Sequence, residues 1–115
     1  MDTYRSEDTI PLWEEESRKK ITLRNVQTGK RYSFVLKYSF VVGRAKEACD
    51  LQLTEEDRYM SGRHLRFIKE GNHICVEDLN TTNGTRLNGR QITSPCRVRC
   101  GDVLRMGRSE FEVTF

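Results

Sequence analysis

The amino-acid sequence predicts an all-β sandwich. Short apolar runs alternate with polar residues at a period of two, which is the pattern of strands with one buried face. Turns that contain glycine separate these runs at close intervals, as in sandwiches built from many short strands. No window shows a sustained period of 3.6 residues, so no helix is predicted.

The first strands are predicted between residues 21 and 53. A turn at residues 27–30 with glycine inside it joins two alternating runs, which is a hairpin signal. Residues 40–42 form a short apolar run that ends at Gly43, as expected of a buried strand. The apolar positions of these predicted strands are Ile21 and Leu23, then Tyr32, Phe34 and Leu36, then Phe40, Val41 and Val42, then Leu51 and Leu53.

The remaining strands are predicted from the same alternation between residues 65 and 115. Turn signals rich in glycine, asparagine and serine divide this half of the chain. The apolar runs lie at 65–68, 74–76, 85–87, 98, 103–106 and 111–115, and the turns between them at 70–72, 88–89 and 107–109.

Length and composition indicate a single soluble domain. The chain has 115 residues, which is enough to bury a core without disulfides or metals. Apolar residues make up 36% and charged residues 32%, as in an ordinary globular protein. Twenty basic and 17 acidic residues leave a net charge of +3, which is too small to indicate a nucleic-acid binder.

The N-terminal segment differs in composition from the rest. Residues 1–19 are polar and lack the apolar surface needed to order themselves, so they are predicted as a flexible tail or linker, and residues 20–115 as the folded domain. No apolar run is long enough to span a bilayer, and the N-terminus has no secretory signal. We therefore expect a cytoplasmic protein without membrane insertion.

The four cysteines give no sign of a metal site or a disulfide framework. Cys49, Cys75, Cys96 and Cys100 form no CxxC pair, and only two histidines are available to complete a metal site. Without secretion, disulfides are not expected. The cysteines are interpreted as reduced thiols, and no metal or other cofactor is predicted.

Three short polar clusters interrupt the strands, at residues 42–44, 61–64 and 80–85. They offer a guanidinium, hydroxyl groups, an amide and backbone N–H groups, and no carboxylate lies among them. Loop residues on a rigid β scaffold commonly form binding sites. A set of donors with one fixed positive charge suits an anion, above all a phosphate.

From about residue 21 to residue 115, the sequence resembles the forkhead-associated (FHA) domain, a phosphothreonine-binding family. No single motif is specific, but all of the family's motifs occur here in order. The matching residues are Gly43-Arg44, Ser61 to His64, Asp78, Asn83-Gly84-Thr85, Asn88-Gly89, Gly101-Asp102 and Gly107. The resemblance implies an antiparallel two-sheet β-sandwich of about eleven short strands, the FHA/SMAD-like architecture.

The resemblance also implies a role for each residue of a phosphopeptide site. Arg44 presents paired N–H donors to the phosphate, and Ser61 donates its hydroxyl. Ser61 and Gly62 add backbone N–H groups, and Thr82 adds another hydroxyl. Asn83 holds the peptide backbone beside the phosphothreonine.

Further residues are predicted around this phosphate site. Gly43, His64 and Gly84 are interpreted as structural support, and Tyr59 as a residue that shapes sequence selection. Gly62 departs from the family, where a large polar residue often follows the serine. Arg63 either compensates for this loss by pointing at the ligand or, if strand alternation holds, points away from it.

Three other functions are weighed against phosphothreonine binding. A hydrolase built on Ser61, His64 and Asp78 lacks a Gly-x-Ser-x-Gly elbow, so an enzyme is not predicted. A nucleic-acid binder is disfavoured because acidic residues dilute the basic ones. A phospho-independent assembly module with the same fold stays open as the alternative.

The expected partner is a phosphothreonine-containing protein or peptide, with a Ser/Thr kinase acting upstream. Thr9 follows the acidic residues Glu7 and Asp8 in the predicted tail, which suits a kinase substrate. Phosphorylated Thr9 is a candidate ligand for the chain's own site, since tethering raises its effective concentration.

Overall fold

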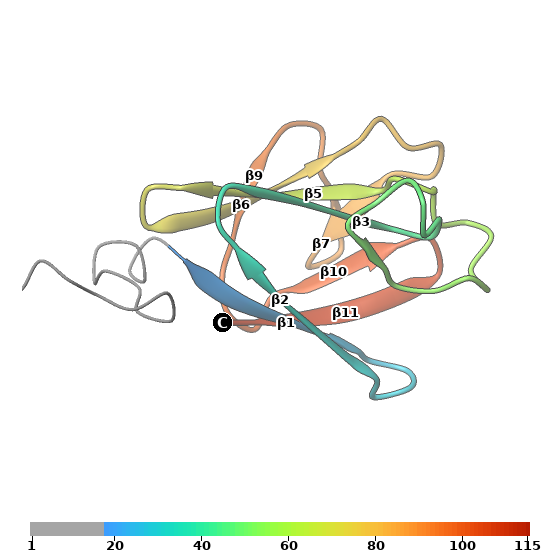
Figure 1. Cartoon of the computed structure of the whole chain (residues 1–115). Coiled ribbons are helices and arrows are strands. Elements are labelled where there is room, and N and C mark those ends of the chain that lie inside the picture. Colours follow the sequence, from blue (N-terminus) through green and yellow to red (C-terminus); the bar gives the residue numbers. More distant parts are fainter. Residues whose placement is uncertain (1–17) are drawn as a thin grey trace, which may run out of the picture.

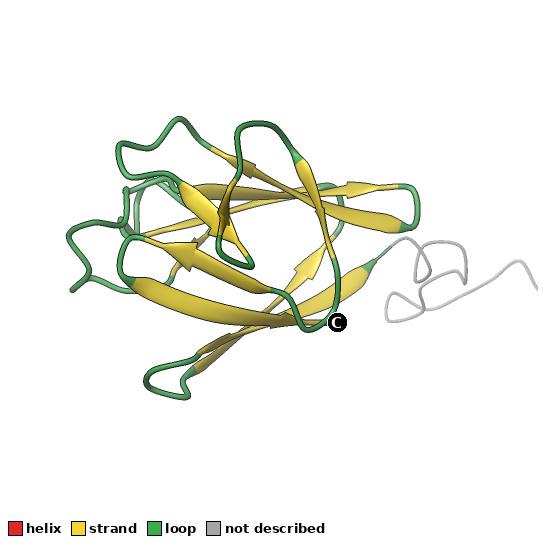
Figure 2. Ribbon diagram, turned by 180° about the vertical axis from the view of Figure 1, so that it is seen from behind, coloured by secondary structure: helices red, strands yellow, loops and turns green. Residues whose placement is uncertain are grey.

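The computed structural model describes residues 18–115, and these residues form eleven β-strands in two stacked sheets (Figures 1 and 2). The prediction of an all-β, two-sheet sandwich of about eleven short strands is confirmed. Most of the predicted tail, with Thr9, lies outside the described residues. Within residues 18–115 there is no helix with the length and apolar character needed to cross a membrane.

The two sheets have six and five strands. The first follows the order β2 (Arg31–Leu36), β1 (Lys19–Asn25), β11 (Ser109–Thr114), β10 (Val103–Met106), β7 (Thr85–Leu87) and β8 (Arg90–Gln91). The second follows the order β4 (Leu51–Gln52), β3 (Ser39–Gly43), β5 (Leu65–Glu70), β6 (His73–Asp78) and β9 (Cys96–Val98).

Neighbouring strands in the described sheets run antiparallel, except for β3 and β4. This parallel pair consists of Val42 opposite Leu51 and Gly43 opposite Gln52. Because the pair is so short, the brief connection 44–50 replaces the long crossover that extended parallel strands need.

The structure differs from the sequence-based strand predictions at several strand ends, and β1 begins at Lys19, the last residue of the predicted tail. Strand β11 ends at Thr114, one residue before the predicted end, and Phe115 is 41% exposed. Strand β8 has no apolar alternation to predict it, because Arg90 and Gln91 are both exposed. The turn before it determines this strand. Asn88 and Gly89 have φ values of 50° and 86°, as a two-residue hairpin turn of type I′ requires.

The core fills the space between the sheets with alternate residues of each strand. Aromatic rings join the two layers: Phe34 of β2 stacks on Phe40 of β3 at 4.1 Å and meets Phe67 of β5 edge-on at 5.3 Å. Side chains with no exposed surface include Ile21, Leu23, Leu36, Val42, Leu65, Phe67, Val76, Leu104, Met106, Phe111 and Val113. The sandwich is therefore a rigid support for its loops.

Four connections meet at one end of the sandwich, at the right of Figure 1 and opposite the start of β1. They are the 44–50 connection between β3 and β4, the 53–64 loop between β4 and β5, the 79–84 loop between β6 and β7, and the β10–β11 turn at residues 107–108. All three polar clusters of the sequence lie in or beside these connections.

The cysteines do not form a cluster with other metal ligands. Within residues 18–115, no three His, Cys, Asp or Glu side chains are placed to hold a metal ion. The four cysteines are free thiols, and Cys100 is the exposed one. Burial raises the pKa of Cys49 and of Cys75, which disfavours a reactive thiolate at either position.

Candidate functional site

Hydrogen bonds between loops bring the three polar clusters together. The Arg44 backbone N–H donates to the Ser61 carbonyl at 3.0 Å, which joins the end of β3 to the 53–64 loop. The Asn83 side chain donates through Nδ2 to the Tyr59 carbonyl at 3.0 Å, which joins the 79–84 loop to the same segment. Residues far apart in the sequence therefore line one end of the molecule.

The Arg44 side chain is oriented by a bond that leaves most of its donors available. Its Nε donates to the Met60 carbonyl at 2.8 Å, and its own carbonyl accepts from Gln52 Nε2 at 2.8 Å. Within residues 18–115, Arg44 forms no ion pair with a carboxylate, and its two Nη groups have no hydrogen-bond partner. This half-buried guanidinium is a fixed positive charge with its fork unoccupied.

His64 forms hydrogen bonds with both the 53–64 loop and the 79–84 loop. Its side chain is completely buried, Nδ1 accepts the Ser61 backbone N–H at 2.9 Å, and Nε2 contacts the Gly84 carbonyl at 3.0 Å. Because Nδ1 accepts, the proton must lie on Nε2, which donates to Gly84. Burial lowers the pKa of His64, against the opposing effects of the Gly84 carbonyl and of Asp78 and Asp57, so the ring is held neutral.

Ser61 and Gly62 pass very close to the end of β3. The Gly62 carbonyl lies over Gly43, and a Cβ at Gly43 would collide with that oxygen. A Cβ at Gly62 would lie 3.1 Å from the Ala45 Cβ. The Ser61 hydroxyl has no hydrogen-bond partner in the described chain, and the Ser61 carbonyl accepts the Arg44 N–H. The Ser61 N–H, predicted as a donor to the ligand, instead donates to His64 Nδ1. The two glycines thus allow the Ser61–Gly62 backbone to approach the end of β3, where the Arg44 N–H donates to the Ser61 carbonyl.

Asp78 organises the 79–84 loop. Its Oδ1 accepts the hydroxyls of Thr81 and Thr85, each at 2.7 Å, and its Oδ2 accepts the Thr81 backbone N–H at 3.0 Å. Burial alone would raise the pKa of Asp78, but the bonds from Thr85 and Thr81 outweigh it, and the pKa lies below its usual range. Asp78 is therefore ionised and fully engaged.

The adjacent residues Thr81 and Thr82 have different environments. The Thr81 hydroxyl donates to Asp78 and accepts the Gly84 backbone N–H at 2.9 Å. Thr82 is exposed, and its hydroxyl makes no hydrogen bond within the described residues. Thr81 thus acts as a turn former, and Thr82 presents a free donor at the surface.

Asp57 is a site-shaping residue that the sequence motifs did not identify. Its Oδ2 accepts the Arg108 backbone N–H and the Ser109 hydroxyl, each at 2.7 Å, and its Oδ1 accepts the Tyr59 N–H at 3.0 Å. These bonds, led by Ser109 and Arg108, outweigh the burial that would raise the pKa of Asp57, so this pKa is lowered. A carboxylate that accepts the N–H two residues later is a common turn device, and this was the available signal.

Tyr59 and Arg108 form a pair at the rim of the site. The Arg108 guanidinium lies over the Tyr59 ring at 4.1 Å from its centroid, and Nη2 donates to the Tyr59 hydroxyl at 3.0 Å. Tyr59 is 45% exposed, so the pair forms part of the accessible surface. No sequence motif signals Arg108, because its partner is remote in the chain.

Arg63 is the predicted site residue with the least structural definition. Its side chain is exposed and makes no hydrogen bond or ion pair within residues 18–115. The structure thus brings Arg44, Ser61, Gly62 and Asn83 into a bonded arrangement and leaves Arg63 outside it.

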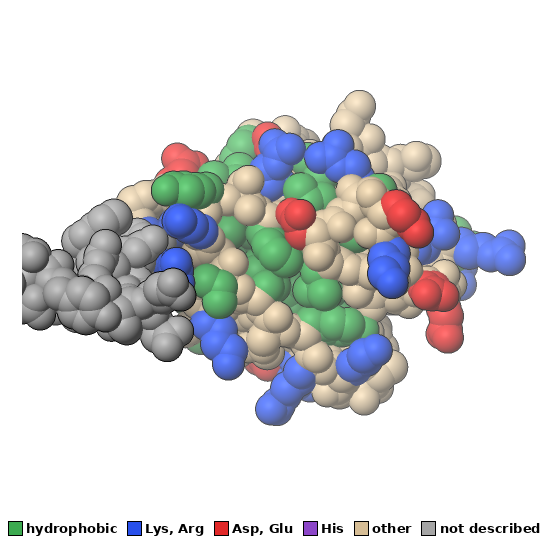
Figure 3. All heavy atoms as spheres, viewed as in Figure 1, with side chains coloured by type: hydrophobic (Ala, Val, Ile, Leu, Met, Phe, Trp, Pro, Cys, Tyr) green, Lys and Arg blue, Asp and Glu red, His purple; other side chains and the backbone are tan. Residues whose placement is uncertain are grey.

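The loop end is suited to an oxyanion. Arg44, Ser61 and Thr82 offer donors without partners, and the nearby carboxylates Asp57 and Asp78 are occupied by internal donors. On the face shown in Figure 3, basic and acidic side chains are mixed, so positive charge is local rather than spread over the surface. Such a site recognises a compact, multiply charged group better than an extended polyanion.

Comparisons with known proteins agree with this arrangement. The FHA domain model matches residues 40–107. The FHA domain-containing protein FhaB of Mycobacterium tuberculosis is 38% identical over 73 residues, which cover 64% of this chain and 45% of FhaB. The matched part is thus less than half the length of that relative.

Two solved structures are similar over most of the chain. One, from a structural and functional analysis of phosphothreonine-dependent FHA domain interactions, has a TM-score of 0.72 and 31% identity and covers 84% of this chain and 97% of its own. The other is the FhaA FHA domain complexed with the intracellular domain of Rv3910, with a TM-score of 0.69 and 32% identity. The match covers 81% of this chain and 98% of the FhaA domain chain. Family model, relatives and structures agree, and the chain belongs to the FHA domain family.

Proposed function

We propose that this chain is a non-catalytic module that binds phosphothreonine peptides, in Ser/Thr-kinase signalling or in assembly of a phosphorylation-dependent complex in the cytoplasm. The observation that carries the proposal is the set of donors without partners on braced loops: the Arg44 fork and the hydroxyls of Ser61 and Thr82. A similar solved structure concerns phosphothreonine-dependent interactions, which supports the same ligand class.

Each donor has a defined part in this proposal. The Arg44 fork binds two phosphate oxygens, and the hydroxyls of Ser61 and Thr82 complete the set with the backbone N–H of Gly62. Because Asn83 uses its Nδ2 on the Tyr59 carbonyl, its Oδ1 is left to accept a peptide N–H. Arg63 adds positive charge at the rim.

The geometry supports recognition rather than hydrolysis. Both ring nitrogens of His64 are engaged, one by the Ser61 backbone N–H and one by the Gly84 carbonyl. The imidazole therefore makes no bond to the Ser61 hydroxyl and cannot take its proton as a triad histidine does.

Calorimetric titration with pools of phosphothreonine, phosphoserine and unphosphorylated peptides tests this proposal. We expect saturable binding of the phosphothreonine pool, lost in Arg44→Ala and weakened in Arg44→Lys, which keeps the charge without the fork. Arg97→Ala, an exposed arginine on β9, is the matched control and should bind as the unchanged protein does. Equal binding of the unphosphorylated pool would instead favour the phospho-independent assembly module.

The predicted tail adds a regulatory hypothesis to this function. Thr9 lies outside the described residues, so its phosphorylation stays a prediction. If phosphorylated Thr9 occupies the site, a kinase-treated chain should bind an added phosphothreonine peptide more weakly than the untreated chain. Thr9→Val should abolish that difference, and mass spectrometry would establish the modification.

A further inference from the structure

Two arginines face each other on the outer surface of the six-stranded sheet. Arg86 of β7 is directly opposite Arg105 of β10 in the register. The neighbouring Thr85, Leu104 and Met106 are buried, so strand alternation directs both arginines outward. Like charges directly opposite each other destabilise a sheet, so the pair has no evident role in folding.

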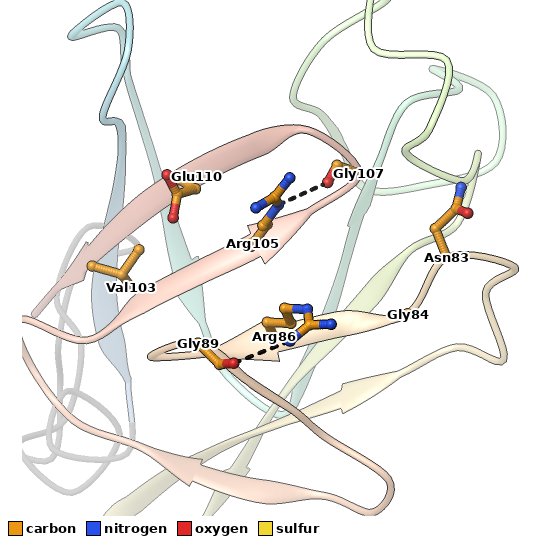
Figure 4. A pocket seen from close by; sticks show the side chains of 8 residues that line it. All are labelled: Asn83, Gly84, Arg86, Gly89, Val103, Arg105, Gly107 and Glu110. Atoms are coloured by element: carbon orange, nitrogen blue, oxygen red, sulfur yellow. Dashed lines mark hydrogen bonds between the residues drawn. The ribbon is translucent and has the colours of Figure 1, made fainter.

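Both guanidinium groups are oriented by backbone carbonyls rather than by acids. Arg86 Nη1 donates to the Gly89 carbonyl and Arg105 Nε to the Gly107 carbonyl, each at 3.2 Å (Figure 4). Neither arginine forms an ion pair within residues 18–115. Their remaining N–H groups are free to bind an anion.

These arginines line a cavity of about 390 Å³ that borders the proposed phosphopeptide site at Asn83. Asn83 and Gly84 of the 79–84 loop form part of its wall, and Gly107 links it to the turn that carries Arg108. Figure 4 shows the two guanidinium groups between Glu110 and Asn83. A ligand held by Asn83 can therefore reach the cavity that both arginines line.

Glu110 is the acidic residue of the cavity wall. It is opposite Arg105 in the register but forms no ion pair with either arginine, and Figure 4 shows it with Val103 at the other end of the cavity. One carboxylate against two guanidinium groups leaves the end near Asn83 positive. This end fits an oxyanion, and two planar forks can bind its oxygens in bidentate fashion.

We propose that the Arg86–Arg105 pocket binds a second anionic group of the ligand, a carboxylate or a phosphoryl group that flanks the phosphothreonine. This inference rests on the proposed function and adds a specificity to it. A charge-assisted hydrogen bond at an accessible site contributes about tenfold in affinity, which corresponds to about 1.4 kcal/mol.

Three phosphothreonine peptide pools test the pocket. One pool has aspartate and glutamate at the flanking positions, the second has asparagine and glutamine there, and the third has phosphoserine. The chain should bind the first or third pool about tenfold more tightly than the second, and the better of the two identifies the anion. In the double variant Arg86→Gln and Arg105→Gln, this preference should vanish while affinity for the amide pool is unchanged.

A control variant separates the pocket from general electrostatics. Arg97→Gln with Arg99→Gln removes the same charge from β9 and the turn after it, and should keep the preference. The Arg86 and Arg105 double variant should also keep a cooperative thermal unfolding transition, because both side chains are exposed and such substitutions change stability little. Binding of all pools without preference would overturn this inference alone. Absence of binding to every phosphothreonine pool would overturn the proposed function as well.

Discussion

Two carboxylates, Asp78 and Asp57, hold the loops on either side of the site, and they act over different distances in the sequence. Asp78 accepts its bonds from Thr81 and Thr85, within a single connection of the five-stranded sheet to β7. Asp57 accepts its bonds from Arg108 and Ser109 as well as from Tyr59, so it joins the 53–64 loop to the opposite sheet.

This difference separates the shape of a loop from its position. Asp78 sets the internal conformation of the 79–84 loop and, through the Gly84 carbonyl, the position of His64. Asp57 sets where the 53–64 loop lies relative to the β10–β11 turn. In both loops the bracing groups are used internally, and neighbouring groups such as the Thr82 and Ser61 hydroxyls are left for a ligand. Substitutions of Asp78 and of Asp57 should therefore have different effects on the two loops.

Substitution of Asp78 should have the largest effect. Asp78→Ala removes the acceptor of two hydroxyls and an N–H, and it leaves the buried Thr85 hydroxyl without a partner. We expect a loss of about 3 kcal/mol in the free energy of unfolding, measured by urea denaturation. Asp78→Asn keeps one oxygen acceptor and should lose less. Equal stability of Asp78→Ala and the unchanged protein would contradict a bracing role.

Gly43→Ala tests a contact on the 53–64 loop that does not depend on Asp57. The added Cβ would collide with the Gly62 carbonyl, so Ser61 and Gly62 must move away from β3. Such overpacking costs about 2 kcal/mol, and the displaced Ser61 should reduce phosphopeptide affinity by at least about tenfold. Gly29→Asn in the β1–β2 turn, where nothing lies within 4 Å of an added Cβ, is the control for binding. Unchanged affinity in Gly43→Ala would show that the close approach does not position Ser61.

Asp57→Ala should remove the hydrogen bonds that join the 53–64 loop to the β10–β11 turn. We expect the free energy of unfolding to fall by about 1–2 kcal/mol, less than for Asp78→Ala, because the partners of Asp57 are more exposed than Thr85. The diagnostic result is local. Amide hydrogen exchange should become faster at Tyr59 and Arg108, whose N–H groups lose their acceptor, and stay slow at Thr81. Faster exchange at Thr81 as well would mean that the two loops are not braced independently.

Structural features that arise from local contacts can be predicted from the sequence, whereas features that arise from long-range contacts cannot. Strands such as 65–70 and 73–78 are visible because their alternation is local, and the polar clusters around Arg44, Ser61 and Asn83 are visible because they interrupt it. Contacts that depend on how the two sheets stack, such as Asp57 with Ser109, have no local pattern. The Arg86–Arg105 pair likewise depends on strand register, which no single segment of sequence specifies.

The pH dependence of stability distinguishes the loop held by Asp78 and His64 from the loop held by Asp57. His64 contacts the Gly84 carbonyl of the 79–84 loop, whose conformation Asp78 sets. The pKa of His64 in the folded protein lies below the ordinary value of 6.5 because the ring is buried. As the pH falls below 6.5, the unfolded state binds a proton that the folded state does not, so the free energy of unfolding decreases. Between pH 7.5 and pH 5.5 we therefore expect the free energy of unfolding to decrease in urea titrations.

The lowered pKa values of Asp57 and Asp78 act in a separate range, since their stabilisation is lost only as the pH falls below about 4. Asp57→Asn should therefore leave the loss between pH 7.5 and pH 5.5 in place. His64→Gln should remove it, because no group in the His64 position then takes up a proton on unfolding. If the loss persists in His64→Gln, the neutral, doubly bonded histidine is not the source of the pH dependence. Asp78 then holds the loop through Thr81 and Thr85 alone.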